Sequence, residues 1–532
     1  MKSRPSTGLE FLLVGVLLFI GCRSMYYSPG SGEPAGSNFA TTGIAGSLFS
    51  ALQVDPRSED SAGPVLAAAG DLDGDSLMDI ASAWNESQPV QVHLQRRNAD
   101  GDIAFQTVQL GGTTPIAKVA GLELEDMDGD GRLDVVVLVK DTGLVATCDP
   151  ARDDCDVTDN GGRIEGAVEG GIVIFYNPDD PAGEPWEATL LTTSFVAGRE
   201  EGASLEEGGY TSLAVGDIDG INGPDIVVAL NSAEGDESLP LETTDGEPQL
   251  NSIDLWANPG PGLARQGEAW ARANIYADLP SVGACRILDV DRDGDRDIVC
   301  TYPTAKSTNV RWLPNPLDLG DLSRVYGFWG IGALCAPIGQ ISAGANSIEI
   351  GDIDNDGIDD VIARSSQGQV VQWFKAPSLP PFDFIRSPWR VYTLAEFRDR
   401  QPQAVAVGDI TGDGRVEVAI SAEGAVAWFG TQGTLSELDQ WTETLIIDDA
   451  PPDSGVGTSP AASTNGLGGL LQFLTDPQQQ AQAESTSTLV SSLLIVDIDG
   501  DGMSDIVGTL DRSDGSGLTN DALVLFQNQR TP

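Results

Sequence analysis

The sequence has little positive charge. Its 532 residues include 29 lysines and arginines against 81 aspartates and glutamates, which gives a formal net charge of -52. A surface this acidic repels nucleic acid and anionic lipid head groups, so neither is an expected partner. Glycine and proline, at 63 and 31 residues, indicate many turns between short elements, which favours an all-β protein.

The usual catalytic combinations are also missing. The chain has one histidine, His93, and shows no Ser/His/Asp or Cys/His arrangement and no zinc-site spacing. His93 falls where other copies of the repeat described below have Trp or Phe, so we expect it in the core. A histidine-dependent active site would have to rest on this single residue.

The N-terminus predicts export. The apolar run Phe11–Ile20 follows Lys2 and Arg4, and it is too short to span a bilayer, which takes about 20 residues. This combination is typical of a signal peptide, here over residues 1–22.

The end of this segment, Phe19-Ile20-Gly21-Cys22, resembles a bacterial lipobox, with Phe19 where Leu is usual. The resemblance implies lipidation at Cys22 and an outer-membrane or cell-surface lipoprotein. Cleavage by the ordinary signal peptidase, which would give a periplasmic or secreted protein, is the alternative. Residues 23–38 then form a flexible tether before the main domain, 39–532.

Cysteines are few, six in all, and five remain if Cys22 is lipidated. Cys148 and Cys155 bracket a polar stretch and are candidates for a loop disulfide. Cys285 and Cys300 flank one acidic loop, so we expect them on neighbouring strands, and Cys335 is the odd one. The pairing cannot be deduced from the sequence, and a buried free thiol is the alternative for each.

An internal repeat dominates the chain. The pattern Asp-x-Asp-x-Asp-Gly-x-x-Asp, with acids at positions 1, 3, 5 and 9, occurs seven times, and we number the copies loops 1 to 7. The five complete copies contain Asp71, Asp73, Asp75 and Asp79 (loop 1), Asp126, Asp128, Asp130 and Asp134 (loop 2), Asp289, Asp291, Asp293 and Asp297 (loop 4), Asp352, Asp354, Asp356 and Asp360 (loop 5), and Asp497, Asp499, Asp501 and Asp505 (loop 7). Two degraded copies keep Asp217, Asp219 and Asp225, with Ile221 at position 5 (loop 3), and Asp409, Asp413 and Glu417, with Thr411 at position 3 (loop 6).

This spacing suits Ca²⁺, which takes six to eight hard oxygen ligands. Positions 1, 3 and 5 of a tight loop can point inward, the glycine at position 6 permits the bend, and the acid at position 9 closes the cage. Without a cation, four close carboxylates would repel one another. Mg²⁺ is disfavoured because it keeps its waters and demands octahedral geometry. We therefore expect about five good calcium sites, with loops 3 and 6 doubtful.

An EF-hand is the obvious rival, and it is excluded. It needs a bidentate Glu at position 12 and helices on both sides. Position 12 of the complete loops is never an acid: the residues are Ser82, Val137, Cys300, Ala363 and Gly508. The flanking segments are short β-branched runs such as Asp134-Val-Val-Val-Leu-Val, which indicate strands.

Each copy continues with a strand that carries aromatic residues, followed by a further strand. We expect these aromatics, such as Tyr176, Trp256 and Trp373, to pack between blades. Four strands per copy, a to d, with the acidic loop between a and b, predict seven four-stranded antiparallel blades of a β-propeller. The chain ends soon after strand c of the last copy, so a segment within Phe39 to Val54 should supply the missing strand d and close the ring.

The repeat resembles the FG-GAP (VCBS-type) repeat of integrin α-subunit propellers, over about residues 64–528. The resemblance implies structural calcium and a surface binding or adhesion module that recognises a protein or glycan. The long connections 140–170, 231–251, 197–209, 330–345 and 451–488 should lie on the face opposite the calcium, where loops on a rigid scaffold would bind the ligand. By composition, 451–488 should be disordered.

We expect a monomer that contacts the membrane only through its lipid anchor. A polysaccharide lyase or hydrolase, and a scaffold subunit of a surface complex, stay as alternatives.

Overall fold

The computed structural model describes residues within 40–529. Residues 1–39 and 530–532 lie outside the described residues, as do several internal segments, of which 198–208, 379–388 and 449–486 are the longest. The predicted signal peptide, Cys22, the tether, Cys335 and nearly all of 451–488 therefore lie outside the described residues. In the described part, no helix is long and apolar enough to cross a membrane.

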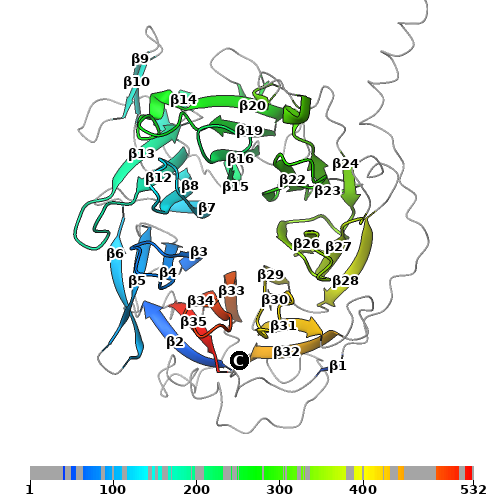
Figure 1. The fold of residues 1–532 in the computed structure, drawn as a ribbon. Coiled ribbons are helices and arrows are strands. Elements are labelled where there is room, and N and C mark those ends of the chain that lie inside the picture. Colours follow the sequence, from blue (N-terminus) through cyan, green and yellow to red (C-terminus); the bar gives the residue numbers. More distant parts are fainter. Residues whose placement is uncertain are drawn as a thin grey trace, which may run out of the picture.

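Seven antiparallel sheets stand around a central axis, as the sequence predicts (Figure 1). Each blade runs outward from strand a to strand d. The first four blades are β3 (Pro64–Gly70), β4 (Asp79–Trp84), β5 (Gln91–Arg97) and β6 (Ile103–Gln109); β7 (Ala117–Glu125), β8 (Asp134–Asp141), β12 (Gly171–Tyr176) and β13 (Glu187–Thr192); β15 (Gly209–Gly216), β16 (Asp225–Asn231), β19 (Ser252–Ala257) and β20 (Ala271–Ala277); and β21 (Cys285–Leu288), β22 (Asp297–Thr301), β23 (Val310–Leu313) and β24 (Ala336–Gly339). The last three are β25 (Ser347–Gly351), β26 (Asp360–Ser365), β27 (Val370–Lys375) and β28 (Arg390–Glu396); β29 (Pro402–Gly408), β30 (Glu417–Ala422), β31 (Ala425–Thr431) and β32 (Trp441–Asp448); and β33 (Ser487–Val496), β34 (Asp505–Ser513), β35 (Ala522–Asn528) and β2 (Phe49–Asp55).

The N-terminal strand β2 closes the ring, which confirms the prediction. It pairs antiparallel with β35, with Leu52 opposite Leu525, and so becomes strand d of blade 7. The two-residue strand β1 (Ala40–Thr41) pairs in parallel with β32 of blade 6. The first and last parts of the chain therefore share a sheet, and β35 is not left as an open edge.

Short additional elements belong to the connections. Three two-stranded pairs are β9 (Ala146–Asp149) with β10 (Asp154–Val157), β11 (Gly166–Val168) with β14 (Phe195–Ala197), and β17 (Leu241–Glu242) with β18 (Pro248–Gln249); two 3-10 helices are η1 (Gly267–Ala269) and η2 (Pro316–Leu319). In β9 and β10, Cys148 stands opposite Cys155, so the predicted disulfide would join residues that are partners in this hairpin's register.

The core lies between blades rather than within one sheet. Seven clusters of buried apolar side chains fill the seven interfaces, and the cluster between blades 7 and 1 joins Leu525 to Trp84. The aromatic residues of strand c belong to these clusters; Tyr176 and Trp256, for example, pack between blades 2 and 3. Strand b is mostly apolar because neighbouring blades cover both of its faces. All six residues of β4, for example, are buried.

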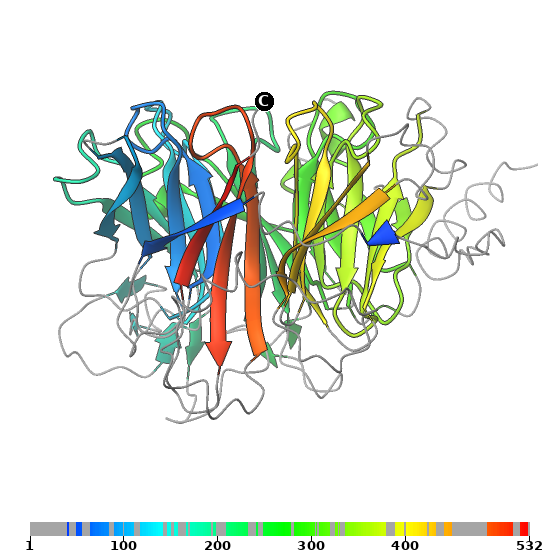
Figure 2. The ribbon, with the colours of Figure 1, turned by 90° about the horizontal axis from the view of Figure 1, so that it is seen from below.

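All seven acidic loops connect strands a and b, and they gather on one face of the disc (Figure 2). Connections from strand c to strand d leave from the same face, because neighbouring strands are antiparallel. Connections from b to c and from d to a leave from the other. The insertions 140–170 and 231–251 are b–c connections, as predicted, and contain the small pairs β9–β10 and β17–β18.

One predicted boundary is wrong. Residues 330–345, expected to connect blades 4 and 5, contain β24, which is strand d of blade 4. This strand has no aromatic residue and contains Pro337, which an edge strand tolerates because one side of its backbone has no partner. The c–d connection of blade 4 is therefore long, 314–335. Its described part, which includes Tyr326, lies on the face of the acidic loops, opposite the face on which the sequence had placed the long connections.

Closure by β2 predicts that the ring depends on residues before the first repeat. A chain that begins at residue 57, without β2, should lose Phe49 and Val54 from the core and expose the edge of β35. We expect its thermal unfolding midpoint to fall far below that of a chain that begins at residue 46, which keeps β2. Equal midpoints for the two chains in a calorimetric scan would contradict this closure.

Candidate metal sites

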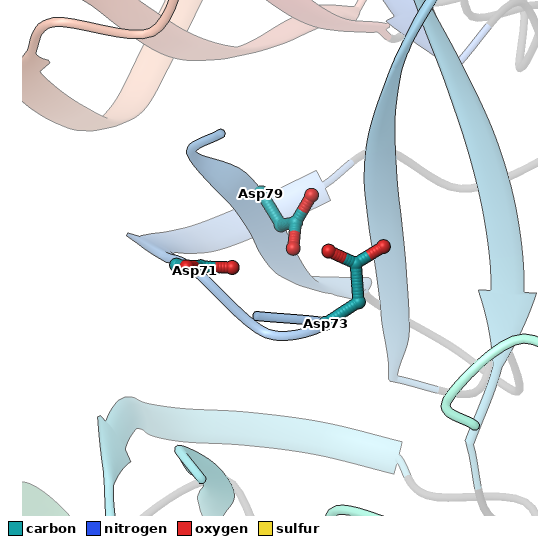
Figure 3. Close-up of side chains that lie close together, drawn as sticks. All are labelled: Asp71, Asp73 and Asp79. Carbon is teal, nitrogen blue, oxygen red and sulfur yellow. The ribbon is translucent and has the colours of Figure 1, made fainter. Parts of the chain in front are cut away.

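The acids of loops 1 to 5 converge as the spacing predicts. In loops 1 to 4, positions 1, 3 and 9 each offer a carboxylate oxygen, and the three oxygens lie within 4.8 Å of one another. Figure 3 shows this group in loop 1, with Asp71, Asp73 and Asp79 around one point. In loop 5 the converging acids are at positions 1, 3 and 5. The degraded loop 3 belongs to the first set, although it lacks an acid at position 5.

Position 1 shapes the loop through hydrogen bonds to the backbone. In loop 2, Asp126 Oδ1 accepts the N–H groups of Gly129 and Asp130, and Oδ2 accepts that of Gly131 at 2.8 Å. Gly131 has φ of 90°, a conformation that glycine adopts without strain. In loop 1 the same place is taken by Ser76 with φ of 69°, so that loop keeps its shape at some conformational cost.

Position 9 is the most buried acid of the loop, and it joins three segments. In loop 2, Asp134 is fully buried; its Oδ2 accepts the N–H of Met127 at position 2, and its Oδ1 accepts the N–H of Asn177 just after strand c. Asp225 and Asp505 make the equivalent pairs of bonds with Ile218 and Asn258, and with Ile498 and Asn528.

Burial makes these carboxyls weak acids in the metal-free protein. It raises the pKa of Asp134 to about 7, against the two backbone hydrogen bonds, which lower it. Burial likewise raises the pKa of Asp297 to about 8. The same cause raises the pKa of the other position-9 acids, to about 6 for Asp79 and about 7 for Asp225, Asp360, Glu417 and Asp505. A bound cation would offset this cost and favour the ionised forms.

Two loop oxygens are buried and have no hydrogen-bond partner among the described residues. They are Asp289 Oδ1 in loop 4 and Asp354 Oδ1 in loop 5. A buried carboxylate oxygen without a partner destabilises the fold, and coordination to a metal ion would remove this destabilisation. The residues present therefore fit a hard cation bound through oxygen atoms.

In the two degraded loops, the remaining acids accept hydrogen bonds from nearby side chains and backbone groups. In loop 3, the Tyr326 hydroxyl from the c–d connection of blade 4 donates to Asp219 Oδ2. In loop 6, the longer Glu417 accepts the N–H groups of Ile410 and Thr411, and the Thr411 hydroxyl donates to it at 3.2 Å. In both loops these donors satisfy oxygens of the acids that remain.

An asparagine that follows strand c also belongs to the site, and it was not predicted. The Asn258 side-chain amide donates to the Pro224 carbonyl in its own blade and to the Met127 carbonyl in the loop of the preceding blade. Equivalent bonds are made by Asn177, Asn315 and Asn528. The signal was present as the repeated Asn-Pro after the aromatic residues in three of these copies.

Two other predictions can be compared with the structure. Cys285 and Cys300 lie opposite each other on β21 and β22, as expected, and form a disulfide across the base of loop 4. His93 is fully buried in blade 1, where its ring nitrogens pair with the hydroxyls of Ser82 at 2.8 Å and Thr107 at 3.0 Å. The only histidine of the chain is thus a core residue, as predicted.

Comparison with known proteins identifies a repeat in two regions of the chain. A family model described as an FG-GAP-like repeat matches residues 71–137 and 352–420, and each match begins at the first aspartate of a loop. The chain therefore contains FG-GAP-like repeats in two regions of a seven-bladed propeller. Two crystal structures of BBS1N in complex with ARL6DN, soaked with lead and with mercury, are similar at 11% identity and a TM-score of 0.45, over 91% of this chain and 98% of theirs. No curated protein matches the chain.

The buried position-9 acids predict an unusual pH dependence for the metal-free protein. Asp297 binds its proton more tightly folded than unfolded, so its contribution to stability is full below its unfolded pKa and is lost as pH rises towards 8. In EDTA, the free energy of unfolding should therefore fall as pH rises from 6 to 7. Asp297→Asn should make that slope shallower by about 1.4 kcal/mol per pH unit, the value for one proton.

Denaturant unfolding at several pH values measures this slope. Glu184→Gln removes one charge from an exposed position and is the matched control. A wild-type slope that Asp297→Asn leaves unchanged would show that this carboxyl does not titrate in the range.

Proposed function

We propose that the protein is a calcium-stabilised binding module, exported or anchored at a surface, that recognises a protein or glycan. The observation that carries the proposal is the set of converging carboxylates, some with buried unpartnered oxygens, at the blade junctions of an FG-GAP-type propeller. Ca²⁺ fits this donor set better than Mg²⁺, because the loop offers many oxygens in an adaptable cage.

Calcium in these loops would be structural. Each loop stands where one blade meets the next, as the bond from Asn258 to Met127 illustrates. The position-9 acids are covered by the strands around them, which leaves little room for a ligand at the ion. The ions would therefore brace a scaffold whose binding residues lie elsewhere.

The face opposite the loops is the proposed ligand-binding face. The b–c connections of blades 2 and 3 leave from it, and they carry the added pairs β9–β10 and β17–β18. Long connections on a rigid scaffold are where binding residues usually occur. The buried position of His93 argues against histidine-dependent catalysis and favours binding.

The disulfide between Cys285 and Cys300 supports an exported protein, since such bonds persist in oxidising compartments. We therefore propose an outer-membrane or cell-surface lipoprotein anchored through Cys22, or otherwise a periplasmic or secreted protein. It would act as a monomer and contact the membrane only through the anchor. The acidic surface leaves nucleic acid an unsuitable partner.

Calcium removal should destabilise the protein strongly. Extracellular calcium modules have dissociation constants of about 10⁻⁴–10⁻³ M. At a tenfold excess of ion, each site would add about 1.4 kcal/mol to stability. The unfolding midpoint should fall in EDTA and recover with calcium but not with magnesium, and indifference to EDTA would defeat the proposal.

Double substitutions in loops 5 and 6 test which loop contributes more to the stabilisation by calcium. In calcium, Asp354→Asn with Asp356→Asn in loop 5 should lower the unfolding midpoint more than Asp409→Asn with Asp413→Asn in loop 6, because loop 6 has Thr411 in place of one acid. In EDTA the difference between the two double variants should shrink. A difference that persists unchanged in EDTA would mean that the substitutions act without the ion.

The ligand class can be tested with an array of glycans and extracellular matrix proteins, probed in calcium and in EDTA. Calcium-dependent binding that is lost when 232–249 is shortened would support the proposed face. Turnover of an acidic polysaccharide without stable binding would instead show an enzyme.

A further inference from the structure

The position-3 carboxylate carries a hydrogen-bond donor from outside its own loop in five of the seven loops. In each case the donor binds Oδ2; the pairs are Arg96 with Asp73, Arg265 with Asp128, Tyr326 with Asp219, Lys375 with Asp354, and Gln527 with Asp499. Such a donor fixes the orientation of the carboxylate and turns the other oxygen into the loop, where in loops 1, 2, 3 and 7 that oxygen also accepts the N–H of position 5. In loop 5 that other oxygen, Asp354 Oδ1, is buried without a partner among the described residues.

Loops 5 and 7 form a natural matched pair. Both begin Asp-Ile-Asp-x-Asp-Gly and keep the acid at position 9. Their donors occupy equivalent places, because Lys375 and Gln527 each precede the residue whose backbone N–H binds the position-9 acid: Ala376 to Asp360 at 2.6 Å and Asn528 to Asp505 at 2.7 Å. The donors differ in charge, an ammonium in loop 5 and a neutral amide in loop 7, and in reach, because Lys375 binds a second loop acid as well.

The charge matters because the donor lies close to the ion position. Lys375 Nζ binds Asp354 Oδ2 and also Asp356 Oδ2, at 2.8 Å, so it bridges two of the expected ligands. The Lys375 side chain is 18% exposed and that of Asp354 12%, so water screens this region poorly. A full positive charge a few ångströms from a divalent ion repels it, whereas an amide at the same place does not.

We propose that the charge of this donor grades the calcium affinities of the loops, so that Gln527 makes loop 7 a tight site and Lys375 makes loop 5 a weaker one. The inference rests on the proposed calcium binding and adds an order of filling to it. Loop 7 lies beside the ring closure, where Arg97 of blade 1 donates to the Asp499 carbonyl; Arg97 is exposed, so water screens its charge more than that of Lys375. Loop 7, at the junction of blades 7 and 1, would then bind calcium at a low calcium concentration. Loop 5 would bind it only at a higher concentration.

Reciprocal substitution tests this order. Hydrogen exchange followed by mass spectrometry reports on each loop separately, through peptides that contain 352–360 or 497–505, as calcium is raised. In the wild type, loop 7 should become protected at a calcium concentration about tenfold lower than loop 5. Lys375→Gln should lower the loop 5 midpoint about tenfold and leave loop 7 unchanged, and Gln527→Lys should raise the loop 7 midpoint by a similar factor.

Lys375→Arg, which keeps both charge and donor, is the control and should leave the loop 5 midpoint in place. Thermal unfolding in saturating calcium verifies that each variant is folded. A loop 5 midpoint that Lys375→Gln does not lower would overturn the inference while leaving calcium binding intact. Absence of calcium-dependent protection in every loop would instead defeat the calcium proposal, and the inference with it.

Discussion

The buried acid at position 9 is the contact on which the propeller depends. It accepts one backbone N–H from the acidic loop and another from the residue after strand c, and so holds strands a, b and c of one blade in register. Because the acid is buried, its ionised form is poorly solvated, and its pKa rises to about 7 for Asp134 and about 8 for Asp297. The architecture therefore favours either a proton or a metal ion at each of these places.

The same loops also join neighbouring blades. The side-chain amides of Asn177, Asn258, Asn315 and Asn528 reach the loop of the preceding blade, while the apolar clusters fill the space between the sheets. The junctions of blades 1–2, 2–3, 3–4 and 6–7 have this asparagine. The junction of blades 4 and 5 has Ala376 in its place. An ion that stiffens a loop would therefore act on two blades at once.

Much of this architecture could be predicted from the sequence, because the repeat fixes both spacing and chemistry. Seven acidic loops between β-branched runs imply seven blades, and the missing last strand implies closure by β2. The prediction failed at β24, where an edge strand with Pro337 lacks the aromatic signature of its counterparts. It also overlooked Tyr326 and Arg265, since contacts from one blade to the loop of another depend on how connections fold back, which no local pattern reveals.

The central claim is that the carboxylate loops hold calcium. Equilibrium dialysis against radioactive calcium, with excess magnesium present, counts the bound ions directly. The account predicts about five per chain, one for each complete loop. A chain that binds no calcium under these conditions, yet stays folded, would contradict it.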